Sequence, residues 1–142
     1  MPRDLRALLI DVAAEARRLP PSGTVSLTGL QRIISALPVA ALIADNDGRY
    51  VLANAAACSL TGHTTDALKR LSVWDLTPDP RAHEAERLWR TFLDRREQSG
   101  EYALLTKDGE VVTVRYAAQI NLLPGLHISL IERRRRLRTT RP

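Results

Sequence analysis

The sequence of 142 residues has one cysteine, few aromatic side chains and no long apolar segment. The single cysteine, Cys58, excludes an internal disulfide and a cysteine-rich zinc site, and a cytoplasmic location is the simplest expectation. The longest uninterrupted apolar run covers only residues 39–44, which is too short to cross a bilayer. Asp4 and Asp11 interrupt the apolar stretch near the N-terminus, so no secretory signal is expected.

Motifs of common catalytic sites are also missing. The sequence has no glycine-rich phosphate loop, no His-Glu-x-x-His pair and no nucleophile elbow. The neighbouring acids Glu84 and Glu86 fall on the polar side of a predicted helix, where they face solvent. We therefore expect no catalytic residue and no metal site, and we do not expect the protein to be an enzyme.

Positive charge is concentrated at the C-terminus. Residues 1–131 hold 15 basic and 15 acidic residues, whereas residues 132–142 hold six arginines and one glutamate. The net charge of +5 therefore belongs to this tail. The tail is a solvated end, the stub of a helix that leads to an effector domain, or a contact for nucleic acid or anionic lipid. Because no aromatic residue is interleaved for base stacking, a nucleic-acid contact is disfavoured.

Two helices are predicted before the first strand. Residues 3–19 carry apolar side chains at helical spacing, and Pro20-Pro21 ends this amphipathic helix. Its apolar stripe includes Leu5, Leu8, Leu9 and Val12. A second helix is predicted over Thr28–Leu37, because Thr28 and Gln31 have the spacing of a capping box.

The rest of the chain alternates between strand and helix patterns. Strands are predicted over residues 39–45, 50–53, 101–106, 110–122 and 126–131, and helices over 55–60, 64–71 and about 79–98. Short turns at both ends of this order require an antiparallel sheet, one face of which the central helices cover. The expected fold class is α+β: a five-stranded antiparallel sheet with helices on one face, preceded by an amphipathic N-terminal helix. The expected parts are the helix and linker at 1–22, the domain at 23–134 and the basic tail at 135–142.

Six short motifs follow one another over residues 36–134. They are Leu37-Pro38-Val39-Ala40, Ala44-Asp45-Asn46-Asp47-Gly48-Arg49, Asn54-Ala55-Ala56 with Leu60-Thr61-Gly62, Val73-Trp74-Asp75-Leu76, Gly100-Glu101-Tyr102 and Lys107-Asp108-Gly109. In this order they resemble a PAS domain, the small sensory module common in bacterial signalling proteins. The motifs are typical of the fold, and they do not specify a ligand or an output.

Several of these residues are expected to have structural roles. Asn54 leaves a strand and caps the helix that follows, Gly62 permits a left-handed helix end, and Trp74 fills the seam between the small helices and the sheet. Two positions depart from the family pattern. Ser129-Leu130-Ile131 stands where many members have an Asp-Ile-Thr triplet that couples the last strand to the output, and His63 stands where many have an aromatic residue.

The resemblance implies a cavity between the sheet and the long helix. Its candidate ligand contacts are apolar and aromatic side chains on the inner side of the helix and of the long strand. They are Leu88, Trp89, Phe92, Val114 and Tyr116. Tyr116 is the most useful polar group among them. A filled core without a ligand is the alternative for the same residues, because such stripes are mostly packing.

Two cofactors known in the family can be tested against the sequence. Haem needs an axial histidine, but His83 falls on the polar side of its helix, and alternation does not decide the face of His127. The photoactive flavin branch needs a cysteine in an Asn-Cys-Arg-Phe type of motif, and residues 72–75 contain none, while Cys58 is expected to be a buried, inert thiol. Neither cofactor is expected, and the ligand is unknown.

The expected function is that of a sensory or regulatory PAS-like domain in signal transduction, as in two-component systems. It would bind a small ligand or a protein partner, signal through dimerisation and act on an effector protein in trans. The apolar stripe of the N-terminal helix has no domain of its own to pack against. Leu5, Leu8, Leu9 and Val12 are therefore expected at a homodimer interface. The alternative is that the helix covers the open face of the sheet within the same chain. The alternative function is a regulator that associates with nucleic acid through its arginine-rich tail.

Overall fold

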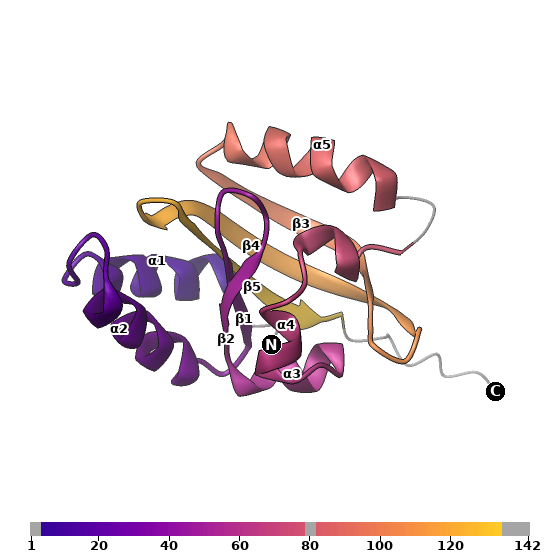
Figure 1. Cartoon of the computed structure of the whole chain (residues 1–142), viewed down its shortest axis with the longest axis horizontal. Helices are drawn as coiled ribbons and strands as arrows, with labels where there is room; N and C mark the ends of the chain where they lie inside the picture. Colours follow the sequence, from indigo (N-terminus) through magenta and orange to yellow (C-terminus); the bar gives the residue numbers. More distant parts are fainter. Residues whose placement is uncertain (1–3, 79–81, 135–142) are drawn as a thin grey trace.

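The computed structural model describes residues 4–78 and 82–134 (Figure 1). The helices are α1 (Leu5–Ala16), α2 (Thr24–Ser35), α3 (Ala55–Thr61), α4 (Thr65–Leu68), the 3₁₀ helix η1 (Val73–Leu76) and α5 (Ala82–Leu93). The strands are β1 (Ala40–Ala44), β2 (Tyr50–Ala53), β3 (Glu97–Leu105), β4 (Val111–Leu123) and β5 (Leu126–Arg133). No helix within the described ranges is long and apolar enough to cross a membrane.

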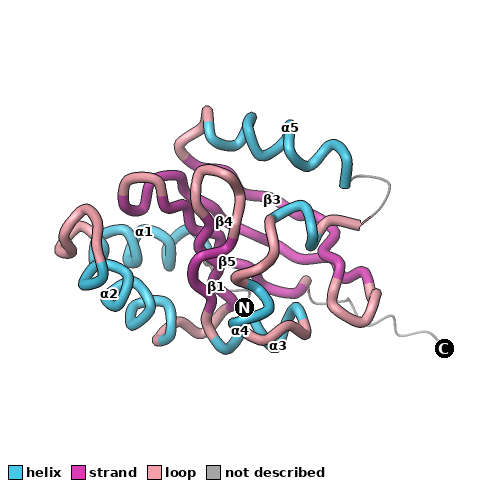
Figure 2. Tube along the Cα trace, viewed as in Figure 1, coloured by secondary structure: helices cyan, strands magenta, loops and turns pink. Residues whose placement is uncertain are grey.

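The five strands form one antiparallel sheet in the order β2-β1-β5-β4-β3. Helices cover both faces of this sheet, with α1 and α2 on one face and α3, α4, η1 and α5 on the other (Figures 1 and 2). The expected α+β fold with a five-stranded antiparallel sheet is therefore confirmed. The N-terminal helices add a second layer to it.

The central strand β5 contributes to two separate interiors. Leu126, Ile128 and Leu130 pack with the N-terminal helices, whereas His127, Ser129 and Ile131 face the side of α5. This alternation is the ordinary period of a strand, in which successive side chains point to opposite faces. Because both faces are covered, His127 and Ser129 on the α5 side are buried or half-buried and do not face open solvent.

The apolar stripe of α1 is buried within its own chain. Leu5, Leu9 and Val12 are 6%, 3% and 1% exposed, and Leu8 packs against the same cluster. The helix lies over β4 and β5 and beside α2. The homodimer interface expected on this stripe is thus corrected in favour of the intramolecular alternative, because the sheet face beneath α1 is itself apolar and buries the stripe.

Two helix boundaries differ from those predicted. α2 begins at Thr24 rather than Thr28, and Gly23 precedes it with φ 101° and no side-chain cap. The buried Ser26 hydroxyl donates to the backbone carbonyl of Ser22 (3.1 Å) one turn earlier, so the predicted capping box at Thr28 does not start the helix. α5 ends at Leu93 rather than Gln98, because β3 begins at Glu97 and pairs with β4. The predicted start of this helix at Asp79 lies outside the described residues.

The predicted caps have the expected geometry. Asn54 precedes α3 and accepts the Ala57 backbone N–H through its side chain, and Gly62 ends α3 with φ 80°. Trp74 is half-buried in η1, and a β-carbon placed on Gly48 would lie 2.9 Å from its ring. Gly48 therefore both turns the β1–β2 hairpin and makes room for the indole.

Candidate functional site

A cavity of about 520 Å³ lies between α5 and the sheet, on the face opposite α1 and α2. All five strands contribute to its lining, together with α5, η1 and the segment that follows η1. Its wall is mostly apolar and aromatic, with a few polar groups among them. A cavity of this kind is typical of small-molecule sites in proteins.

Four of the five predicted pocket residues line this cavity. Trp89 and Phe92 approach from α5, Leu88 lies beside them and is half exposed, and Tyr116 comes from β4. Val114 is fully buried in the core of the same sheet face and is not among the lining residues. Val114 lies two residues before Tyr116 on the same face of β4, where it belongs to the packed core cluster.

An aromatic cluster forms the wall near α5. The Trp89 and Phe92 rings have centroids 5.2 Å apart, and the His127 ring meets them edge-on at 5.8 Å and 6.4 Å. The indole N–H of Trp89 donates to the backbone carbonyl of Asn46 in the β1–β2 turn (3.0 Å). This hydrogen bond ties α5 to the sheet across the top of the cavity.

His127 is the site residue whose face the sequence left undecided. The Asn121 backbone N–H donates to its Nδ1 (2.9 Å), so Nδ1 carries no proton and Nε2 does. The Nε2–H then donates to the Asn46 side-chain oxygen (2.7 Å). Burial lowers the pKa of His127, with a smaller opposing effect of Asp45, so the ring is neutral. Both ring nitrogens are engaged, and neither offers a lone pair to a haem iron in this arrangement.

Three tyrosines line the opposite part of the wall. The Tyr102 and Tyr116 rings meet edge-on with centroids 5.0 Å apart, and Gln98 donates to the Tyr116 hydroxyl (2.7 Å). Burial raises the pKa of Tyr50 and of Tyr102 well above the ordinary value. Tyr102 and Asp75 raise the pKa of Tyr50 further, and Tyr116 raises that of Tyr102. These side chains are therefore protonated hydrogen-bond donors throughout the neutral range.

Other residues considered in the sequence lie away from this cavity. Cys58 is half-buried in α3 with its sulfur 3.4 Å from the Thr65 hydroxyl, and His63 is half-buried outside the lining. The side chain of His83 lies outside the described residues. Within the part of the chain that the structure describes, no three His, Cys, Asp or Glu side chains gather as a metal site would require.

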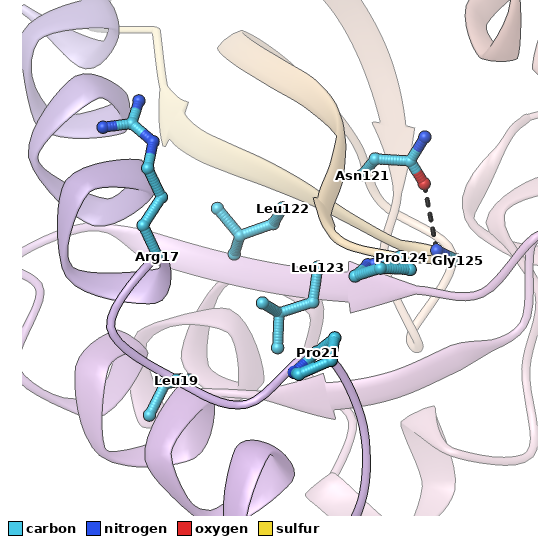
Figure 3. A pocket seen from close by; sticks show the side chains of 8 residues that line it. All are labelled: Arg17, Leu19, Pro21, Asn121, Leu122, Leu123, Pro124 and Gly125. Atoms are coloured by element: carbon cyan, nitrogen blue, oxygen red, sulfur yellow. Dashed lines mark hydrogen bonds between the residues drawn. The ribbon is translucent and has the colours of Figure 1, made fainter.

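A second hollow of about 370 Å³ lies where the linker after α1 meets the β4–β5 turn (Figure 3). It is lined by Arg17, Leu19, Pro21, Asn121, Leu122, Leu123, Pro124 and Gly125. Asn121 has φ 51°, and its side-chain oxygen accepts the Gly125 backbone N–H (2.9 Å). The Asn121 backbone N–H also donates to the ring of His127. The end of β4 beside this turn therefore positions the histidine, which faces the other side of the sheet.

The first arginines of the basic tail make ion pairs with the domain. Arg133 pairs with Glu110 (3.5 Å) and Arg134 with Glu101 (3.1 Å), and all four side chains are about half exposed. The predicted tail at 135–142 lies outside the described residues. Exposed pairs of this kind contribute little to stability.

Comparisons with known proteins agree with this architecture. A family model of the PAS fold matches residues 28–121. A domain of a sensory box sensor histidine kinase/response regulator from Geobacter sulfurreducens has a TM-score of 0.63 at 19% identity, covering 76% of this chain and 94% of that chain. A PAS domain from Desulfitobacterium hafniense has a TM-score of 0.62 at 18% identity, with coverages of 72% and 99%.

A LOV protein from Rhodobacter sphaeroides is similar at the same level. Its TM-score is 0.64 at 16% identity, covering 75% of this chain and 65% of that chain. No curated protein sequence matches this chain. The family model covers well over half of the residues, so the chain belongs to the PAS family.

Proposed function

We propose that the chain is a sensory domain in signal transduction, which binds a small molecule between α5 and the sheet. The observation that carries this proposal is the cavity of about 520 Å³, walled by Trp89 and Phe92 on one side and by all five strands on the other. A ligand there would touch α5 and the central strand β5 at once. Binding would therefore favour one packing of α5 over others and shift their populations.

The position of α5 supports a route for the signal. A short connection leads from α5 to β3, an edge strand of the sheet. At the start of this connection the Arg95 backbone N–H donates to the Phe92 carbonyl. The described contacts of α5 run mainly to η1 and through Trp89 to the β1–β2 turn. A helix held by so few contacts can repack at low cost, and the strand that follows it would carry the change to the surface.

The proposed role is regulatory rather than catalytic. In the described lining, His127 has both nitrogens engaged, and Tyr50 and Tyr102 have pKa values raised away from neutrality. These groups suit hydrogen bonding to a ligand and do not form a pair of nucleophile and base. An effector protein in trans and a homodimer belong to the same proposal. The homodimer would use a surface other than the buried stripe of α1.

Native mass spectrometry and a visible absorption spectrum of the purified full chain test this proposal. The mass reports the oligomer and any ligand that co-purifies, and the spectrum reports a coloured cofactor. Isopropylnaphthalene, a neutral apolar ring compound, then serves as a probe of the cavity, with Trp89 fluorescence as the readout in a Trp74→Phe background.

The expected result is saturable quenching of Trp89 by the probe. Ala118→Leu, which places a larger side chain into the cavity from β4, should abolish it, while thermal unfolding shows that this variant is folded. An apparent affinity that is the same in Ala118→Leu and in the parent would contradict the proposed site. A monomeric mass at all concentrations would end the dimer part of the proposal.

A further inference from the structure

We propose that this cavity selects neutral, ring-containing ligands that carry a hydrogen-bond acceptor, such as aromatic ketones, and rejects carboxylates and phosphates. The inference rests on the proposed function, since it names the ligand class of the same cavity. It is carried by unpartnered tyrosine hydroxyls, by the charge of the lining and by the placement of the aromatic rings.

Two hydroxyl groups in the lining are free to donate. Tyr50 and Tyr102 both line the cavity, and neither hydroxyl has a hydrogen-bond partner among the residues that the structure describes. No fully buried side-chain nitrogen or oxygen among the described residues lacks a partner, so these two hydroxyl oxygens are accessible, and both side chains line the cavity. A phenol that keeps its proton offers a donor, and the complementary ligand group is an acceptor such as a carbonyl oxygen or a ring nitrogen.

The charge of the lining opposes an anion. The described lining contains no lysine or arginine, and its single formally charged side chain is the carboxylate of Glu101. Arg134 pairs with this carboxylate from outside the lining, and His127 is neutral. Arg95, which follows α5 and is exposed, opposes the rise that burial causes in the pKa of Tyr116, but it does not line the cavity. An anion bound here would lose its hydration without gaining a buried cation.

The aromatic side chains favour a flat ring. Trp89 and Phe92 face the cavity from α5, while Tyr102 and Tyr116 face it from β3 and β4. A planar ligand between these two groups can stack on one and meet the other edge-on, which is the preferred geometry of aromatic pairs. Tyr50 lines the same cavity from β2, and Asp75 of η1 acts on that side chain.

Three naphthalenes substituted at the same ring position test the inference. Acetylnaphthalene is neutral and carries an acceptor, naphthoate is the anion of similar shape, and isopropylnaphthalene is the neutral compound of similar shape without an acceptor. Their affinities are measured on the full chain by Trp89 fluorescence and by equilibrium dialysis. We expect acetylnaphthalene to bind at least about tenfold more tightly than naphthoate, because the anion must be desolvated.

Tyrosine variants separate the acceptor from general apolar binding. Tyr50→Phe and Tyr102→Phe should each weaken acetylnaphthalene about fivefold, the usual effect of one lost hydrogen bond, and leave isopropylnaphthalene unchanged. Glu101→Gln should strengthen naphthoate, whereas Glu97→Gln, on the same strand outside the lining, should not. Unchanged binding of isopropylnaphthalene also shows that the variants are folded.

The outcomes distinguish this inference from the proposed function. If isopropylnaphthalene binds but naphthoate binds as tightly as acetylnaphthalene, the ligand class is wrong while the cavity stands. If the double variant Tyr50→Phe/Tyr102→Phe still prefers acetylnaphthalene over isopropylnaphthalene, the role of the hydroxyls is wrong. If none of the three compounds binds, the proposed site falls, and the inference falls with it.

Discussion

At the scale of single residues, Asn54 joins three elements through one buried amide. Its side-chain oxygen accepts the backbone N–H groups of Ala41 and Ala57 (both 3.0 Å), and its nitrogen donates to the carbonyls of Ile34 (2.8 Å) and Val39 (2.9 Å). The residue is 3% exposed. The sequence predicted the cap of α3, because an asparagine between a strand and a helix is a common cap. It did not predict the bonds to the end of α2 and to β1, which depend on tertiary placement.

Replacing Asn54 by alanine should destabilise the fold strongly. Four backbone groups lose a hydrogen bond to this buried side chain, and we expect a loss of about 3 kcal/mol in the free energy of unfolding. Urea denaturation followed by circular dichroism measures it. Thr64→Ala is the matched control, since Thr64 caps α4 at an exposed position and its loss should cost about 1 kcal/mol. Equal losses in the two variants would contradict the central role of Asn54.

His127 makes stability depend on pH in the acid range. Because burial lowers its pKa, the folded chain binds a proton less readily than the unfolded chain, whose histidine titrates near the ordinary value of 6.5. The stabilising contribution is complete above that value and is lost as the pH falls below it. The free energy of unfolding should therefore decrease between about pH 7 and pH 5.

A variant without an imidazole checks the assignment. His127→Gln should show a smaller decrease over the same pH range, whereas His63→Gln, outside the cavity, should keep the decrease of the parent. Denaturation curves at several pH values give both slopes. If the His127 variant keeps the full slope, another group is responsible.

The position of His127 also shows what the sequence could not tell. Apolar and polar residues alternate over residues 126–130 of β5, a pattern that usually places the polar side in solvent. Here helices cover both faces of the sheet, so His127 is buried on the α5 side. The polar partners are distant in sequence from each other: Asn46 lies in the β1–β2 turn, and Asn121 lies in the irregular end of β4 just before the β4–β5 turn. Nothing in the local pattern brings these two segments together, so this part of the candidate site required the structure.

At the scale of elements, α1 belongs to the interior of its own chain. The periodicity of its apolar residues predicted the helix and its buried face, but periodicity does not identify what covers that face. Periodicity also does not determine where a helix ends when a neighbouring strand competes for the same residues, as at the end of α5. Helical patterning continues past Leu93, yet pairing of Glu97 with Gln119 extends the sheet and overrides it.

Adjacent residues of α1 should respond very differently to truncation. Leu9 is 3% exposed and Ile10 is 65% exposed. Leu9→Ala should lower the free energy of unfolding by about 3 kcal/mol, because it leaves a cavity against the sheet. Ile10→Ala should change it by less than about 0.5 kcal/mol.

Light scattering after size exclusion separates this account from the dimer interface first expected. If the stripe packs within the chain, Leu9→Ala lowers stability at an unchanged molecular mass. A halved mass with unchanged thermal unfolding would show instead that Leu9 lies between two copies.

At the scale of the whole molecule, the sheet separates two interiors that differ in filling. The one under α1 and α2 is a packed apolar cluster, whereas the one under α5 contains the cavity. Hydrogen exchange should therefore respond locally to a ligand. With acetylnaphthalene bound, the backbone amides of residues 86–93 should exchange more slowly, because the ligand adds contacts to a helix that has few.

The amides of α1 serve as the internal reference for this measurement. They should exchange at the same rate with and without the compound, since the sheet lies between them and the cavity. Protection of α1 equal to that of α5 would show that the ligand stabilises the chain as a whole.

The five strands along the chain and the turns between them were predictable because turn residues and apolar runs are local signals. The cavity was foreseen only through the family resemblance, since a filled core and a hollow one are lined by the same residue types. What distinguishes them is how far α5 stands from the sheet, and tertiary contacts of α5 such as the Trp89–Asn46 hydrogen bond cannot be read from composition.

The two-sided sheet makes this chain a suitable scaffold for engineering. Residues that line the cavity can be randomised while the opposite cluster, from Leu5 to Leu130, keeps its packing and continues to hold the strands in register. Libraries in the wall at Leu88, Ala103 and Ser129 should thus yield many soluble clones, and an indole already placed at the binding surface would report occupancy in each of them without a label.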